Sequence, residues 1–189
     1  LSLCPAAFAA TAGGQVTLAP SYKATYCASS GFVTPAASPT DVFKIWGSAS
    51  KTVRILKILV GSNAASNEGI VPFFIIKRST AGSGGTSAAV TIVPLDSTFA
   101  AATCSVKTYT ANGTVGTAVG NIVNGDFVFS STSNGGGIFT PALQVIFDAD
   151  KFGSALVLRG TAENVAVNFN GVTPPYFGDC SYTVIFTEE

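Results

Sequence analysis

Residues 163–169 read Glu-Asn-Val-Ala-Val-Asn-Phe. Successive side chains of a β-strand point to opposite faces, so Val165, Val167 and Phe169 share one face. The other face carries only small and polar side chains, Asn164, Ala166 and Asn168. This alternation predicts a strand at the surface of a sheet, with one face in the core and the other toward solvent.

The same kind of pattern continues through most of the chain. From residue 41 onward, short β-branched and aromatic runs alternate with Gly, Ser, Asn and Pro, which is typical of all-β proteins. No stretch holds a 3.6-residue apolar period over three turns, so long helices are not expected. The pattern predicts an antiparallel β-sandwich, jelly-roll-like, over residues 41–189. The predicted strands are 41–46, 52–60, 70–78, 89–94, 101–109, 118–123, 126–130, 142–148, 155–160, 163–169 and 180–187.

Residues 1–40 have a different composition, rich in Ala, Ser, Thr, Gly and Pro. Only 16–18 and 22–26 resemble strands. We predict an extended N-terminal arm that gains order by lying on another chain. A loosely packed N-terminal strand followed by a linker is the alternative.

The strand phases also predict which side chains form the core. Two strands, 52–60 and 70–78, are apolar on both faces and therefore need a second cover. That cover is either a loop of the same chain or a neighbouring subunit, and the low charge of the chain favours the neighbour. The predicted core residues are Phe43, Ile45, Val53, Ile55, Phe74, Ile76, Val106, Val145, Phe147, Val165, Val167, Phe169, Val184 and Phe186.

Composition excludes some classes of function. Charged residues make up 11% of the 189 residues, against about a quarter in ordinary soluble domains. Neutral and apolar surface of this kind usually ends against a partner. The net charge is zero and no basic run exists, so a nucleic-acid partner is not expected. The apolar runs fall short of the roughly 20 residues of a membrane-spanning helix, so no membrane partner is expected either.

The chain contains few groups suited to catalysis. Histidine is absent, which removes the usual general base and the usual zinc ligand. Asp148 and Asp150 are two residues apart and could place two oxygens near a Ca²⁺ ion. However, they lie where the strand 142–148 ends, and turn chemistry alone explains aspartate there. We therefore expect no enzyme, no catalytic residues, no metal and no cofactor, with Asp148 and Asp150 as the first ligands to test.

Aromatic and glycine-rich segments offer weaker signals. The long Gly-rich loops 79–87 and 130–137 do not open helices, as nucleotide-binding loops do, and flexibility is their simpler explanation. The pair Asn112-Gly113 marks a tight turn. Some aromatic side chains could stack on sugars, although a core or contact role is commoner for single aromatics. These are Trp46, Tyr109, Tyr176 and Phe177.

The four cysteines share no CxxC spacing. Cys104 and Cys180 lie in phase with apolar neighbours and are expected to point inward as free, buried thiols. A Cys104–Cys180 or a Cys4–Cys27 disulfide is the alternative.

Several segments resemble, in the same order along residues 21–189, a family of mostly uncharacterised tailed-bacteriophage and prophage proteins. The segments begin at Thr40 (TDVFKIWGSASKTVR), Lys77 (KRSTAGSGGTS), Tyr109 (YTANGTVGTAVG), Leu158 (LRGTAEN) and Asn168 (NFNGVT), and the chain ends in FTEE. The resemblance implies a virion β-sandwich of the kind used for capsid decoration, head fibres or tail appendages. It transfers no catalytic motif.

Together, the composition and the resemblance predict a virion structural protein that decorates or cements the capsid, or forms part of a head fibre. Its expected partners are copies of itself, as a homotrimer, and a major capsid or other virion protein. It would be assembled in the host bacterial cytoplasm. The alternatives are a receptor-binding module of a tail fibre or spike, and a secreted bacterial adhesin or pilin-like subunit.

Overall fold

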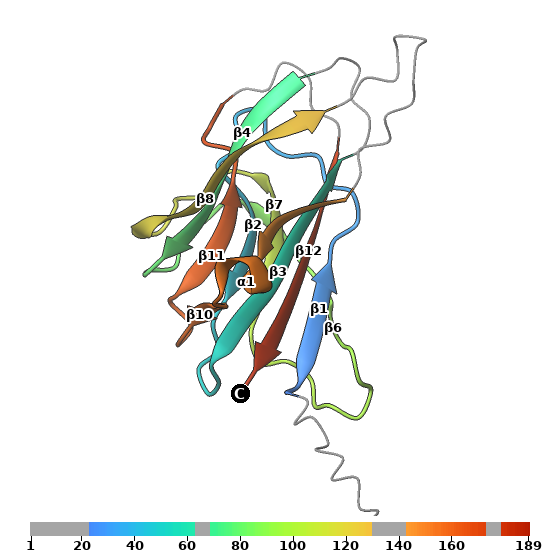
Figure 1. The fold of residues 1–189 in the computed structure, drawn as a ribbon. Coiled ribbons are helices and arrows are strands. Elements are labelled where there is room, and N and C mark those ends of the chain that lie inside the picture. The colour runs from blue at the N-terminus through green and yellow to red at the C-terminus, as the bar shows by residue number, and fades with distance from the viewer. Residues whose placement is uncertain (1–22, 63–68, 130–142, 173–178) are drawn as a thin grey trace, which may run out of the picture.

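Two six-stranded antiparallel sheets pack face to face in the computed structural model of the chain (Figure 1). The structure describes residues 23–62, 69–129, 143–172 and 179–189. The only helix in these ranges has four residues. The prediction of an antiparallel β-sandwich is confirmed at this level.

The first sheet, sheet A, has the strand order β10–β3–β12–β1–β6, with β9 also paired to β3. β9 and β10 follow one another along the same edge of β3, and the short helix α1 (Ala149–Phe152) separates them. The strands of sheet A are β1 (Thr25–Ser29), β3 (Val53–Ser62), β6 (Ile92–Pro94), β9 (Gln144–Asp148), β10 (Leu156–Leu158) and β12 (Cys180–Glu188).

The second sheet, sheet B, has the order β5–β7–β2–β11–β4–β8. Its strands are β2 (Asp41–Trp46), β4 (Gly69–Arg78), β5 (Thr86–Ala89), β7 (Val106–Ala111), β8 (Ala118–Phe129) and β11 (Asn164–Asn168). The predicted strand 89–94 is split, because β5 pairs with β7 in sheet B while β6 pairs with β1 in sheet A. The predicted strands 118–123 and 126–130 are instead one strand, β8.

The core lies between the sheets and contains most of the predicted residues. Phe43 of β2 stacks on Tyr182 of β12 across the two layers, with ring centroids 5.3 Å apart. Phe74 is wrongly assigned, because β4 buries the opposite phase, Val71, Phe73 and Ile75. The remaining predicted core residues except Val145 are buried.

Val145 is exposed because β9 contains a bulge. Leu59 of β3 pairs with Val145 and the next residue, Ile58, pairs with Phe147, so Ile146 is the extra residue. A bulge shifts the phase of a strand by one residue. Ile146 and Phe147 are consequently both buried, while Val145 is 47% exposed.

A second bulge explains the two apolar faces of β3. Where β12 advances by one residue, β3 advances by two, which leaves Leu56 unpaired with β12. Val53 and Ile55 before the bulge, and Ile58 and Val60 after it, are all buried. One extra residue therefore places Ile58 and Val60 on the same inward side as Val53 and Ile55, and these four residues need no neighbouring subunit as a cover, while Leu56 and Leu59 are half-buried.

The predicted boundary of the N-terminal arm at residue 40 is wrong for the described part of the arm. β1 lies inside sheet A, between β12 and β6, and Tyr26 and Ala28 are fully buried. The Tyr26 hydroxyl donates to the Ala100 carbonyl at 2.9 Å. The alternative of an N-terminal strand holds here: the strand-like segment 22–26 overlaps β1, which continues to Ser29. Residues 1–22 lie outside the described part of the chain.

Candidate functional site

The outer face of sheet B is covered by the chain itself over β11. Asn164, Ala166 and Asn168, predicted to face solvent, are at most 6% exposed. The segments 79–85 and 112–117 lie over them: the Asn164 side-chain amide donates to the Thr80 carbonyl at 3.1 Å. The cover of these three residues therefore comes from the same chain. Ile70 of β4 is 64% exposed, and a neighbouring subunit as the cover of β4 stays a prediction.

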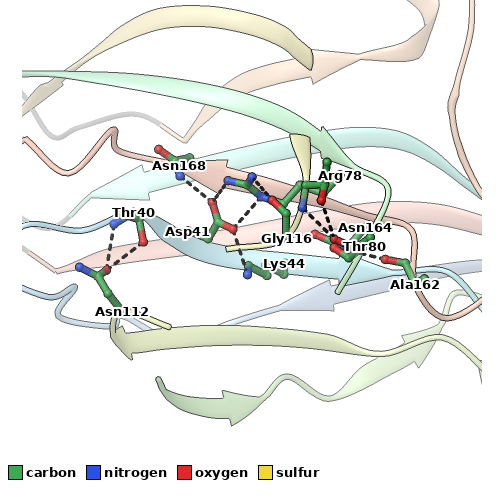
Figure 2. Close-up of polar contacts among 11 residues, drawn as sticks. Thr40, Asp41, Lys44, Arg78, Thr80, Asn112, Gly116, Ala162, Asn164 and Asn168 are labelled. Atoms are coloured by element: carbon green, nitrogen blue, oxygen red, sulfur yellow. Dashed lines mark hydrogen bonds and ion pairs between the residues drawn. The ribbon is translucent and has the colours of Figure 1, made fainter. Parts of the chain in front are cut away.

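Beneath this cover, a buried ion cluster is built around Asp41 (Figure 2). Its carboxylate accepts two hydrogen bonds from Arg78, at 2.9 and 2.7 Å, and one from Asn168 at 2.5 Å. The Lys44 ammonium group lies 2.9 Å away. The charged side chains are 2–5% exposed. Burial alone raises the pKa of Asp41, but the bonds from Arg78, Asn168 and Lys44 outweigh it and hold that pKa below its usual value.

Strand register brings these residues together. Asp41 at the start of β2 pairs with Asn168 of β11, and Arg78 ends β4 on the other side of β11. Ala166, on β11 between the two strands, is small enough to let the long side chains meet above it. Asp41, Arg78 and Asn168 are more than 30 positions apart in sequence, so only the sheet order places them in one cluster, whereas Lys44 is three residues from Asp41.

The cluster holds two cations and one carboxylate. Besides Asp41, Arg78 donates to the Gly116 carbonyl at 2.8 Å. The Lys44 ammonium group lies 5.0 Å from the centre of the Tyr109 ring, a cation–π distance. The cluster therefore leaves an excess of one positive charge under this part of the surface.

The Gly-rich segment 79–85 is held against 112–117 by backbone pairing. Ser83 and Thr114 exchange two hydrogen bonds, of 3.0 and 2.7 Å. A Cβ atom at Gly82 would lie 2.2 Å from the Thr114 carbonyl oxygen, so no other residue fits there without a shift. The segment is thus paired with its neighbour at Ser83, and the flexibility expected for the loop 79–87 stays a prediction. The other Gly-rich loop, 130–137, lies outside the described residues.

A hollow of about 360 Å³ lies on this face, beside the Gly-rich segment 79–85. Its floor consists of outward side chains from three neighbouring strands: Trp46 of β2, Lys107 and Tyr109 of β7, and Ser87 of β5. Residues 82–84 form one wall. The volume is near the lower end of the range of ligand pockets, about 300–1,000 Å³.

Lys107 and Trp46 are in contact within the hollow. The Lys107 ammonium group lies 5.9 Å from the centre of the Trp46 ring. Burial, and the nearby Asp41 carboxylate, raise the pKa of Tyr109, so its hydroxyl stays protonated at neutral pH. Of the four aromatic residues singled out from the sequence, the structure brings Trp46 and Tyr109 together, while Tyr176 and Phe177 lie outside the described residues.

Sequence reasoning overlooked the other residues of the hollow. Ser105, Lys107 and Tyr109 are polar at every second position, opposite in phase to the apolar Cys104 and Val106. That alternation predicts an outer face that carries polar side chains. The position of the wall formed by residues 82–84 could not be predicted from the sequence, because it depends on pairing with residues 30 positions away.

Asp148 and Asp150 have a local structural role at the start of α1. Asp148 caps α1, and its side chain accepts a hydrogen bond from the Asp150 backbone N–H at 3.1 Å. It also pairs with Lys57 at 3.4 Å. Gly153 ends the helix with φ of 69°. This confirms the turn interpretation, and no cluster of three or more potential metal-binding side chains occurs in the described ranges.

The cysteines of the described segments, Cys27, Cys104 and Cys180, are free thiols. The alternative Cys104–Cys180 disulfide is therefore not formed, and Cys4 lies outside these segments. Burial raises the pKa of Cys180 to about 12, and burial together with the Glu188 carboxylate raises that of Cys104 well above its usual range. Since the thiolate is the nucleophile, both groups are unreactive near neutral pH.

Comparison with protein families, curated proteins and solved structures finds no match to this chain. Among the described residues, no helix has the length and apolar character required to cross a membrane.

Proposed function

We propose that the chain is a non-enzymatic structural protein of a tailed-bacteriophage particle. In this role it decorates or cements the capsid, or forms part of a head fibre, and it assembles in the host cytoplasm. Its partners are copies of itself, in a homotrimer, and a major capsid or other virion protein. We also propose that the strands are connected as in a jelly roll.

The observation that carries the proposal is the edge of sheet B at β8, which pairs with no further strand among the described residues. β8 is the last strand in the sheet order, has twelve residues and contains one charged residue, Asp126. Long edge strands usually carry charges or prolines that prevent pairing with another chain. Val119 on this strand and Ile70 on the neighbouring β4 are each 64% exposed. An edge of this kind is suited to strand pairing with a second protein.

Single substitutions test the edge. We expect Val119→Lys and Ile70→Lys to fold, because both side chains are exposed, and to reduce incorporation into particles. Val93→Lys is the matched control, since Val93 is 54% exposed at the edge of the other sheet. Incorporation is measured by quantitative mass spectrometry of particles purified from the phage or prophage that encodes the chain. Wild-type incorporation of both β8-edge variants would refute this use of the edge.

The same measurement tests the place of the protein in the particle. A copy number comparable to that of the major capsid protein is expected for a decoration protein. A few copies per particle would contradict the head assignment. Light scattering of the purified chain tests the homotrimer, and a monomer at micromolar concentration would contradict it.

Residues 1–22 are proposed to provide attachment to the particle. A deletion must stop before β1, because that strand completes sheet A. We expect a chain lacking residues 1–22 to fold, as judged by circular dichroism, but not to enter particles. Full incorporation of the truncated chain would show that attachment lies elsewhere.

A receptor-binding module of a tail fibre or spike is the second candidate. The hollow that contains Trp46 and Tyr109 favours it, because aromatic rings beside hydroxyl groups suit a sugar receptor. Low copy number together with saccharide binding would support this candidate over the first.

A further inference from the structure

Hydrogen-bonded backbone supports the floor and one wall of the hollow on the outer face of sheet B. Its floor belongs to three hydrogen-bonded strands, and its Gly82–Gly84 wall is held by the paired backbones of Ser83 and Thr114. Arg78 further anchors the 112–117 segment through the Gly116 carbonyl. A ligand entering here therefore need not order a loop, which reduces the entropy lost on binding.

The chemistry of the lining suits a polyhydroxylated ring. Ser87, Ser105 and Thr161 line the hollow, and their hydroxyl groups can both donate and accept hydrogen bonds. The Thr103 hydroxyl is already used within the chain: it donates to Glu188 at 3.1 Å and lies 2.6 Å from the Ser48 hydroxyl. Trp46 and Tyr109 add two aromatic rings, which contact the C–H face of a sugar while hydroxyl groups bind its edge. Apart from these rings and the lysine stem the lining has little apolar surface, so a purely apolar ligand would leave the hydroxyl groups unsatisfied.

The charge of the hollow favours an acid over a neutral sugar. Among the described residues Lys107 lines it and no carboxylate does. In the same part of the chain Lys107 has no ion-pair partner. Glu163 pairs with Lys77, and the buried Glu188, which accepts hydrogen bonds from Thr103, pairs with Lys51. The buried Asp41 cluster beneath adds its own excess positive charge. A ligand carboxylate at Lys107 would thus meet an uncompensated cation.

We propose that this hollow binds a saccharide unit that carries a carboxylate, of the uronic or sialic acid type. The sugar ring contacts Trp46 and Tyr109, and the carboxylate pairs with Lys107. This inference goes beyond the assembly role and does not depend on it, because its evidence is confined to the hollow.

The chain offers a direct reporter, since Trp46 is its single tryptophan. Its fluorescence is titrated with glucuronic acid and N-acetylneuraminic acid, and with glucose, N-acetylglucosamine and inorganic phosphate as comparison probes. We expect a saturable change in Trp46 emission with at least one acidic sugar at millimolar concentration, and a weaker response to the neutral sugars and to phosphate. The response of the indole N–H in a ¹⁵N-correlated NMR spectrum should follow the same order.

Lys107→Gln is expected to weaken binding of the acidic sugar roughly 10- to 100-fold, as befits loss of a charge-assisted hydrogen bond. Lys107→Arg should retain most of the affinity, and circular dichroism confirms that both variants are folded. Lys151→Gln, at an exposed lysine on α1, is the matched control and should bind as the wild type does.

Three results would overturn the proposal. The first is no Trp46 response to any sugar at millimolar concentration. The second is equal binding of neutral and acidic sugars with no effect of Lys107→Gln. The third is binding of phosphate as tight as that of the sugar acids, which would indicate a simple anion site. None of these outcomes bears on particle assembly, so failure here leaves the proposed function standing.

Discussion

Replacing Asp41 by Asn removes the carboxylate on which Arg78 and Lys44 converge. The substitution nearly preserves the size and shape of the side chain, so the packing of β2 is little disturbed. It leaves two cations in a cluster whose side chains are 2–5% exposed. The expected effect is therefore the electrostatic cost of a buried charge without its partner, rather than the cost of a cavity.

Removing one partner of a buried ion pair typically lowers the free energy of unfolding by about 3–5 kcal/mol. A surface pair gives the contrast: Glu189 bonds to Lys23 and Arg54, whose side chains are 53% and 36% exposed. Ion pairs between exposed side chains contribute far less, because water and salt screen them. We therefore expect Asp41→Asn to destabilise the chain by about 3–5 kcal/mol and Glu189→Gln to have a much smaller effect.

The assay is equilibrium unfolding in guanidinium chloride, followed by far-ultraviolet circular dichroism and by Trp46 fluorescence. Coincident transitions from the two probes would justify a two-state free energy. A loss for Asp41→Asn no larger than that for Glu189→Gln would refute the reasoning, because it would show that Arg78 and Lys44 are hydrated in the folded chain.

The pH dependence of stability is a second test of the same cluster. The folded-state pKa of Asp41 lies below its usual value of 3.8, so its contribution to stability is present above about pH 4 and lost as the pH falls through the folded-state pKa. The difference in stability between wild type and Asp41→Asn should therefore be constant near neutral pH and shrink on acidification below pH 4. A difference that grows on acidification would contradict the sign of this shift.

Replacing all three charged residues tests whether the cluster itself is stabilising. Buried ion clusters exchanged for apolar residues of similar volume are often neutral or stabilising. A triple variant, Asp41→Leu with Lys44→Met and Arg78→Met, should thus recover most of the stability lost in Asp41→Asn. Recovery of less than half would mean that the bonds to Asn168 and Gly116 contribute more than the ion pairs do.

Three further predictions concern a core aromatic ring, a close backbone contact and a buried thiol. Phe186→Ala should lower the free energy of unfolding by about 3–5 kcal/mol in the same denaturation assay, because the ring is fully buried; a loss under 1 kcal/mol would contradict its place in the core. Gly116→Ala should cost about 1–3 kcal/mol or more, since its Cβ would lie 1.8 Å from a backbone carbonyl oxygen, whereas Gly120→Ala, with open space, should change stability by less than about 1 kcal/mol. The Cys104 thiol should react with a disulfide reagent near neutral pH only as fast as the chain unfolds; rapid labelling of the native protein would show that it is accessible and ionisable.

Local alternation was sufficient to predict much of the fold. Most inward residues were found because a strand with one buried face shows a period of two, as Val165, Val167 and Phe169 do. One error, Val145, falls where the extra residue Ile146 changes the phase, which a strictly alternating pattern cannot represent. The other, Phe74, has a different reason: β4 is apolar on both faces, so alternation alone did not show which face is inward.

Less of the candidate site could be predicted from the sequence. Trp46 and Tyr109 were recognised as residues able to contact a sugar, but nothing local showed that they lie on neighbouring strands. Lys107 acquires its significance only when β7 is placed beside β2, with Lys44 opposite it.

The sequence by itself therefore determined the all-β class, most strand positions, most of the core and the scarcity of catalytic groups, because each follows from composition or from neighbours within a few residues. Only the tertiary structure decided the order of strands in the sheets, the place of β1 within sheet A, and the cover of Asn164, Ala166 and Asn168. It also decided the convergence of Arg78 and Lys44 on Asp41 and the hollow beside Trp46. The physical reason is that hydrogen-bonded neighbours in a sheet are chosen by long-range pairing, and no local pattern of side chains records which distant strand will lie alongside.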